Sequence, residues 1–185
     1  MRIIREGMAL LRGLFLKIKI SVVNKNSYCG NCVRVMKGTD IRVRKDSSLY
    51  IGNHAKVGKD VCISALNGGS ITIGDNVGIG DNSRIISHGK ISIDNGTIIA
   101  PNVHVYDHDH SYANGLIERK KYNVSEITIG KNAWIGVNNV ILRGSIIGDG
   151  CIIGAGCVVK GTVKDNSIFV QKRENIIKEI NIQSN

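Results

Sequence analysis

Three histidines and two aspartates lie within one short segment, His104-Val105-Tyr106-Asp107-His108-Asp109-His110. Imidazole titrates near neutral pH, so a histidine here can accept a proton from a substrate hydroxyl. A neighbouring carboxylate can orient the ring and raise its basicity. The same residues can also form an ordinary solvated loop. Which interpretation holds depends on the elements that position them.

A repeat dominates the chain from residue 51 onward, because an aliphatic residue recurs every six positions. The series comprises Ile51, Val57, Ile63, Ile73, Ile79, Ile85, Ile93, Ile99, Val105, Ile129, Ile135, Ile141, Ile147, Ile153 and Val159. A six-residue period fits neither a flat strand nor a helix, but it fits a short strand followed by a corner. Three such sides close one coil, and coils stack as parallel strands. We therefore predict an all-β fold, a left-handed parallel β-helix or triangular solenoid.

The interruptions of the period share one position, since the register breaks after Ile63, after Ile85 and after Val105. Each is the third aliphatic position of its coil, so all three insertions leave the solenoid at the same edge. The third, residues 106–128, is long and polar, and we expect an extended loop there. Long loops on a rigid solenoid usually carry function.

The repeat also predicts which polar residues meet at that edge. His88 follows Ile85 by three positions, as His108 follows Val105, so the two histidines are expected to be neighbours one coil apart. Asn82 and Arg84 precede the same edge. An arginine there can pair with the carboxylate of an acidic sugar, although it can also be a solvated coil residue. The candidate acceptor-binding residues are thus Asn82, Arg84, His88 and His108.

Three segments are expected: an N-terminal helical capping segment at 1–32, the β-helix catalytic domain at 33–163 and a tail at 164–185. In residues 1–20 an apolar helical face is interrupted by basic residues, and the stretch is too short and too charged to span a bilayer. It either caps the open end of the solenoid or lies on an anionic membrane surface, and the two roles are compatible.

Charge and cysteine content narrow the class of protein. The net charge of +10 favours anionic partners, but only 4% of residues are aromatic and no nucleic-acid motif is visible, so nucleic acid is not expected. Five cysteines and no secretion signal favour a reducing cytoplasm, at most at the inner face of the membrane. Cys29 and Cys32 form a lone pair without further ligands, and we predict no metal site.

Three segments carry a family resemblance: Asp107-His108-Asp109-His110, the run from Ile127 to Gly136, and the run from Ile152 to Val159. With them, residues 50–163 resemble the hexapeptide-repeat acetyltransferases, particularly the maltose, galactoside and capsular-polysaccharide O-acetyltransferases. The resemblance implies an acyltransferase that uses acetyl-coenzyme A to modify a sugar hydroxyl in a bacterial cell-surface glycan such as capsule or O-antigen. It also implies a homotrimer with active sites between subunits.

The resemblance further implies roles for single residues. A catalytic histidine in this family precedes a tryptophan by 24 residues, as His110 precedes Trp134, so His110 is the expected base and His108 its rival. Trp134 is expected against the pantetheine arm. The residues expected to line the coenzyme groove are Ala100, Trp134, Gly136, Val137, Ala155 and Lys160. The chain departs from the family after its last Val-Val, where Lys160-Gly161 replaces Thr-Lys, which puts the adenine end of the coenzyme in doubt.

The two expected catalytic residues lie on different edges of the solenoid. One small site within a single subunit can hardly use both, because one side spans roughly 15–20 Å at strand rise. A cyclic trimer, in which His110 of one chain faces Trp134 of a neighbour, solves this.

Two other functions share the architecture. One is N-acetyl transfer to an amino-sugar nucleotide. The other is a metal-dependent hydratase like the γ carbonic anhydrases, for which His104, His108 and His110 are the tempting ligands. Analysis of bound metal discriminates the second.

Overall fold

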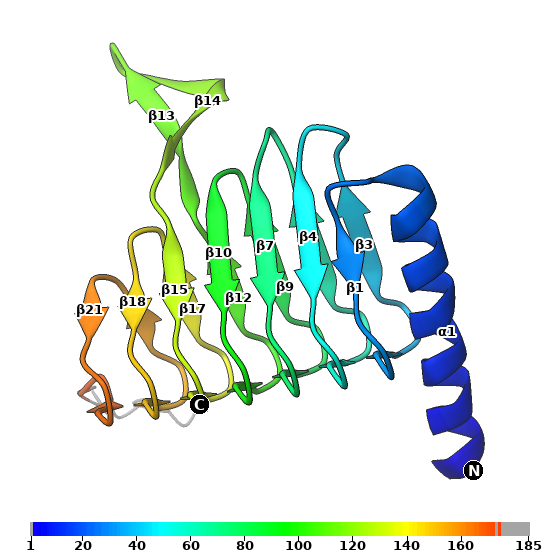
Figure 1. Cartoon of the computed structure of the whole chain (residues 1–185). Helices are drawn as coiled ribbons and strands as arrows, with labels where there is room; N and C mark the ends of the chain where they lie inside the picture. Colours follow the sequence, from blue (N-terminus) through cyan, green and yellow to red (C-terminus); the bar gives the residue numbers. More distant parts are fainter. Residues whose placement is uncertain (1, 173, 175–185) are drawn as a thin grey trace, which may run out of the picture.

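The computed structural model describes residues 2–172 and 174. In this part of the chain a helix, α1 (Arg2–Val23), is followed by a parallel β-solenoid, and α1 covers the first coil (Figure 1). The predicted parallel β-helix is confirmed. Successive short strands of the solenoid fall in turn on three sheets, here called A, B and C, and only β13 and β14 among the described strands lie outside this order.

Sheet A consists of β1 (Tyr28–Cys29), β4 (Ser48–Ile51), β7 (Ser70–Ile73), β10 (Lys90–Ile93), β15 (Ile127–Ile129), β18 (Ile146–Ile147) and β21 (Thr162–Val163). Sheet B consists of β2 (Arg34–Val35), β5 (Lys56–Val57), β8 (Gly78–Ile79), β11 (Ile98–Ile99), β16 (Trp134–Ile135), β19 (Ile152–Ile153) and β22 (Ile168–Phe169). Sheet C consists of β3 (Asp40–Val43), β6 (Cys62–Ala65), β9 (Arg84–Ser87), β12 (His104–Tyr106), β17 (Val140–Leu142) and β20 (Val158–Val159).

The core is a set of aliphatic columns, one inside each sheet. In sheet A, Ile73 pairs in register with Ile93, and Ile93 pairs with Ile129; all three are fully buried. Each inward side chain therefore stands above its counterpart in the next coil, and burial of each is worth about 1.5–3 kcal/mol. Corners need left-handed backbone, which asparagine tolerates, as at Asn102 with φ of 58°.

The edge between sheets C and A carries the insertions, as predicted. The segment after Val105, expected to be an extended loop, is instead an antiparallel hairpin of β13 (His108–Ala113) and β14 (Leu116–Val124), which projects from the solenoid in Figure 1. Its tip is Asn114-Gly115, with φ of 51° and 77°. Asn-Gly is the pair that two-residue hairpin turns favour. The two strands lack apolar alternation because the hairpin lies largely in solvent. The sequence pattern therefore did not predict them.

The ends of the solenoid lie beyond the predicted 33–163. The first sheet strand is β1, and β22 continues sheet B after residue 163. Ala9 and Ile20 of α1 are buried against the first coil, and a Cβ on Gly13 would lie 1.9 Å from the carbonyl oxygen of Val33, so the helix caps the solenoid closely. Of the predicted tail, residues 173 and 175–185 lie outside the described residues. Across the part described, no helix is long and apolar enough to cross a membrane.

Candidate active site

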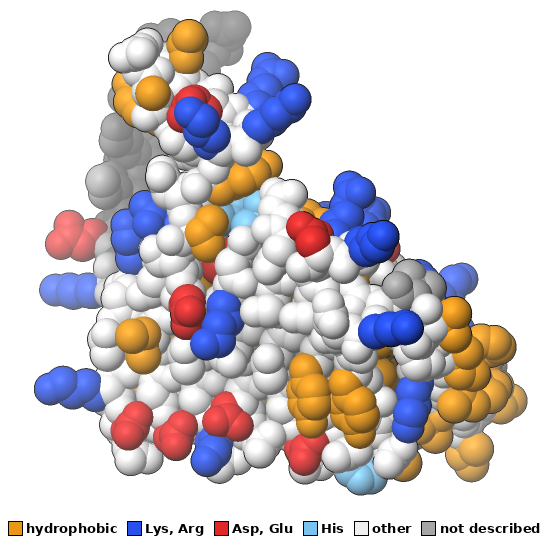
Figure 2. Space-filling view, turned by 45° about the horizontal axis from the view of Figure 1, so that its top comes forward, with side chains coloured by type: hydrophobic (Ala, Val, Ile, Leu, Met, Phe, Trp, Pro, Cys, Tyr) orange, Lys and Arg blue, Asp and Glu red, His pale blue; other side chains and the backbone are white. Residues whose placement is uncertain are grey.

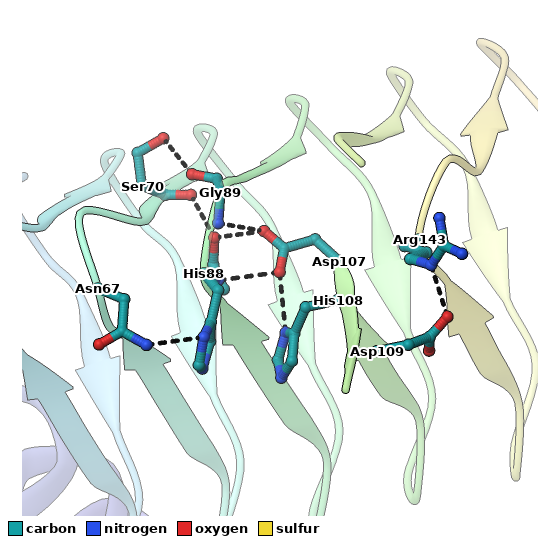
Figure 3. Close-up of polar contacts among 9 residues, drawn as sticks. Asn67, Ser70, His88, Gly89, Asp107, His108, Asp109 and Arg143 are labelled. Atoms are coloured by element: carbon teal, nitrogen blue, oxygen red, sulfur yellow. Dashed lines mark hydrogen bonds and ion pairs between the residues drawn. The ribbon is translucent and has the colours of Figure 1, made fainter. Parts of the chain in front are cut away.

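Asp107 is the centre of the polar cluster at the C–A edge. It follows β12 directly and is fully buried. Its Oδ2 accepts hydrogen bonds from the Ser87 hydroxyl at 2.7 Å and the Gly89 amide at 2.9 Å. Its Oδ1 accepts from the His88 amide at 2.9 Å and contacts Nδ1 of His108 at 3.0 Å (Figure 3). The neighbouring coil, through Ser87, His88 and Gly89, thus donates three of the hydrogen bonds that the carboxylate accepts.

These donors keep Asp107 ionised. Burial alone would raise its pKa, but the hydrogen bonds from the side chains of His108 and Ser87 and from the amides of His88 and Gly89 together lower the pKa below its usual value. A buried carboxylate is stable in this form only when it is fully hydrogen-bonded, as it is here.

The contact with Asp107 fixes the tautomer of His108. An ionised carboxylate only accepts, so Nδ1 of His108 carries the hydrogen. The other nitrogen, Nε2, then presents a lone pair, which is the form a general base needs. The His108 side chain is 13% exposed, so the ring is held in place but reachable.

His88 lies directly beside His108, with ring centroids 3.9 Å apart, which confirms the predicted adjacency (Figure 3). The side-chain amide of Asn67 donates to Nδ1 of His88 at 2.9 Å, and this places the hydrogen of a neutral His88 on Nε2. Burial, and then the neighbouring His108, lower the pKa of His88. The neutral ring is therefore favoured, and the pair offers one acceptor and one donor side by side.

The hairpin covers this pair. Tyr122 of β14 contacts His88 edge-on at 4.1 Å and lies 5.4 Å from His108 and 4.9 Å from His110, measured between ring centroids. The tyrosine thus shields one side of the histidines from solvent.

His110 occupies a different environment from His108. It lies on β13, is exposed and faces Tyr122 across the hairpin. Asp109 is paired with Arg143 of the loop after β17, so it does not orient a histidine. Of the two carboxylates considered as orienting groups, only Asp107 contacts an imidazole.

Asn82 and Arg84 lie away from the histidines. Asn82 is a corner residue with φ of 58° at the edge between sheets B and C, and Arg84 begins β9. Arg84 precedes His88 by four positions of extended chain, roughly 13 Å. The structure therefore does not bring these two predicted acceptor-binding residues to the histidine pair within one chain.

The predicted coenzyme residues divide between two edges. Ala100, Gly136, Val137 and Ala155 follow strands β11, β16 and β19 at the B–C edge, where the Ala100 amide donates to the carbonyl of Ile135 and the Gly136 amide to that of Ile153. Trp134 points outward from sheet B and is 53% exposed. Lys160 instead follows β20 at the C–A edge and is exposed.

His104 lies on sheet C with its ring edge-on to Tyr106, apart from the stacked histidine pair. Among the residues that the structure describes, no group of three histidine, cysteine, aspartate or glutamate side chains is placed to hold a metal ion.

Four residues of the site escaped sequence reasoning: Asn67, Ser87, Tyr122 and Arg143. Ser87 and Asn67 had a signal, because each stands in the coil next to a candidate histidine at the edge that carries the insertions. Tyr122 and Arg143 had none, since their contacts depend on how the hairpin folds back over the edge.

Comparisons with known proteins agree with this fold. Residues 126–161 match the family described as Bacterial transferase hexapeptide (six repeats), which confirms the predicted resemblance. A protein of Escherichia coli (strain K12) named as a lipopolysaccharide biosynthesis O-acetyl transferase, WbbJ, is 29% identical over 148 residues. That match covers 75% of this chain and 76% of the relative.

Two solved structures are also similar. A maltose O-acetyltransferase from Clostridium difficile 630 is 26% identical with a TM-score of 0.53, over 71% of this chain and 64% of that chain. AntD, an N-acyltransferase from Bacillus cereus solved with dTDP and 3-hydroxybutyryl-CoA, is 21% identical with a TM-score of 0.69, over 84% of this chain and 83% of that chain. The likeness to AntD concerns the fold alone.

The fold and the matched repeats thus make this chain similar to the hexapeptide-repeat transferases. WbbJ and the maltose O-acetyltransferase, which are 29% and 26% identical to this chain, are both acyltransferases by name. Acyl transfer is therefore supported at this level.

Proposed function

We propose that the protein is an acetyl-coenzyme A-dependent O-acetyltransferase that modifies a sugar hydroxyl of a bacterial cell-surface glycan, with His108 as the general base. The observation that carries the proposal is the buried Asp107 carboxylate on Nδ1 of His108, which leaves Nε2 as a proton acceptor. His110, the base expected from the family spacing, has no such partner among the described residues, and it is the alternative to be tested.

The chemistry follows from this arrangement. As the sugar oxygen attacks the thioester carbonyl, Nε2 of His108 takes the hydroxyl proton, and Asp107 stabilises the imidazolium that forms. When the carbon–sulfur bond breaks, the same proton passes to the departing thiolate of coenzyme A. Transfer is direct, so no nucleophilic serine or cysteine is required. The Nε2 hydrogen of a neutral His88 can donate to an oxygen of the bound acceptor.

Oxygen is proposed as the acceptor atom because a hydroxyl needs a base as it attacks, which the histidine–carboxylate pair supplies. An amine also has to give up a proton before the amide forms, so the choice of acceptor in the assay below decides between the two atoms. N-acyl transfer to an amino-sugar nucleotide is the second candidate, because the similar fold of AntD belongs to an N-acyltransferase that was solved with dTDP.

We propose that coenzyme A binds against sheet B and the B–C edge. Outward residues there form an in-register ladder of Ile98, Trp134 and Ile152, of which Ile98 and Trp134 are more than half exposed. This apolar ladder, beside the small corner residues Ala100 and Gly136, fits the narrow pantetheine arm. Lys160 can contact a phosphate of coenzyme A only if that coenzyme lies along sheet B of another protomer.

The division of the site between edges supports a homotrimer. His108 is at the C–A edge, while Trp134 is on sheet B of the same chain. In a cyclic trimer, the histidine edge of one protomer faces the sheet B ladder of its neighbour, and both parts of the site meet. The exposed apolar ladder is then covered as well.

Release of coenzyme A thiol from acetyl-coenzyme A tests the reaction class. Neutral and acidic glycans are compared as acceptors with amino-sugar nucleotides. Release that depends on a glycan without amino groups, with an alkali-labile ester in the product, is the expected result. Release only with an amino-sugar nucleotide, giving an alkali-stable amide, would assign the enzyme to nitrogen.

A further inference from the structure

The outward face of α1 is a continuous apolar surface. The helix packs on the solenoid through Ala9, Leu16 and Ile20, and the opposite side of the helix points to solvent. Figure 2 shows hydrophobic side chains gathered there, over α1 at the right of the molecule. The exposed apolar residues of this face are Ile4, Met8, Leu11, Phe15, Ile18 and Val22, all at least 49% exposed. A surface of this kind marks an interaction site.

A stripe of cations borders this apolar face. Arg5, Arg12 and Lys19 recur every seven residues and so lie along one side of the helix. The acidic residue of α1, Glu6, is paired with Arg34 of the solenoid at 3.5 Å, so it does not offset the stripe. Helix and border together form an apolar strip with a positive flank.

A groove continues the strip onto the solenoid. Between α1 and the first coils lies a hollow of about 600 Å³ whose lining includes the apolar side chains Ile4, Met8 and Met36. Cationic side chains line the same hollow, among them Arg12 and Lys59. A hollow lined by both apolar and cationic side chains matches an amphiphile that has an acyl tail and an anionic head group.

We infer that α1 lies in the surface of an anionic lipid bilayer, with its apolar face among the acyl chains and Arg5, Arg12 and Lys19 at the head groups. A helix with one apolar face and basic flanks binds such surfaces in the plane. A second copy of the chain fits less well, because antiparallel face-to-face contact would bring the two cationic stripes together, and parallel contact would give neither stripe an anionic partner from α1, whose Glu6 is paired with Arg34. The inference is independent of the acyl-transfer reaction.

Co-sedimentation of the full-length protein with vesicles tests this. One set of vesicles is phosphatidylcholine, and the other contains equal parts of phosphatidylcholine and phosphatidylglycerol. The wild type is expected to bind the anionic set, and added salt is expected to weaken that binding. The double variant F15S/I18S is expected to lower the partition coefficient more than about tenfold, and R12E/K19E similarly.

Matched controls keep the test independent of folding. Ile146→Ser removes an equally exposed isoleucine from sheet A, and Lys131→Glu reverses an exposed charge outside the helix. Both are expected to bind like the wild type, and circular dichroism checks that every variant is folded. Equal binding to both vesicle sets, or unchanged binding of F15S/I18S, overturns the inference. So does a change in oligomer size in F15S/I18S when the wild type binds neither vesicle, because the face then contacts another copy.

Discussion

At the scale of single residues, Asp107 determines what His108 can do. Asparagine at position 107 has nearly the same shape as aspartate. Its NH2 group, however, would face the hydrogen-bond donors that the carboxylate now accepts from. We expect Asp107→Asn to lower kcat by roughly 10²–10⁴-fold through the wrong tautomer of His108, and to reduce the free energy of unfolding by about 1–3 kcal/mol. Steady-state kinetics and urea unfolding measure the two effects. Near-wild-type kcat in a folded variant would contradict the role given to Asp107.

The lowered pKa of His88 leads to a prediction about how stability depends on pH. Its pKa is lowered in the folded protein, chiefly by burial, so below the ordinary histidine pKa of about 6.5 the unfolded chain binds more protons than the folded one. This residue therefore costs stability as the pH falls through that value. His88→Phe keeps a ring against His108 and removes the titration. The urea midpoint of the wild type should fall relative to that of the variant between pH 8 and pH 5, and a constant difference would refute the prediction.

The positions of residues inside the coils could be predicted from the six-residue repeat. The positions of residues on the hairpin were harder to predict, because the repeat does not extend through it. The adjacency of His88 and His108 followed from equal offsets after Ile85 and Val105, because each coil restarts the register. The choice of His110 rested on a count back from Trp134. The 24 residues counted between His110 and Trp134 include the whole hairpin. The length of the hairpin has no effect on the position at which β12 ends.

At the scale of elements, the hairpin of β13 and β14 is the part of the site that the sequence concealed. Its Tyr122 covers the histidines. We expect Tyr122→Ala to raise KM for the acceptor at least severalfold with a smaller change in kcat, because the base remains in place while one wall of the site is lost. Tyr122→Phe retains the ring, so its KM separates ring contact from hydroxyl contact. Unchanged KM in Tyr122→Ala would show that the hairpin does not contact the acceptor.

The solenoid itself was almost fully predictable. A buried aliphatic every six residues leaves few alternatives to short strands and corners, and the columns of Ile73, Ile93 and Ile129 lie as the period required. The hairpin escaped because most of its side chains are exposed to solvent, so its strands carry no apolar alternation. Only Asn114-Gly115 at its tip could have revealed it.

At the scale of the whole molecule, the proposed function requires that protomers share the site. We expect light scattering to report a trimer for the wild type. Trp134→Asp places a charge in the sheet B ladder and is expected to yield monomers that lose acyl transfer, while Ile146→Asp, an equally exposed change on sheet A, remains trimeric. A monomeric wild type that retains full activity would contradict the shared site.

The most direct test of the central claim compares His108→Ala with His110→Ala in glycan-dependent release of coenzyme A. We expect His108→Ala to lower kcat by roughly 10²–10⁴-fold, the contribution typical of a general base. His110→Ala, in which the exposed neighbour is removed, is expected to stay within about tenfold of wild type, because Asp107 and His108 are untouched. Collapse of activity in His110→Ala with a largely active His108→Ala would make His110 the base and rule out the role proposed for His108.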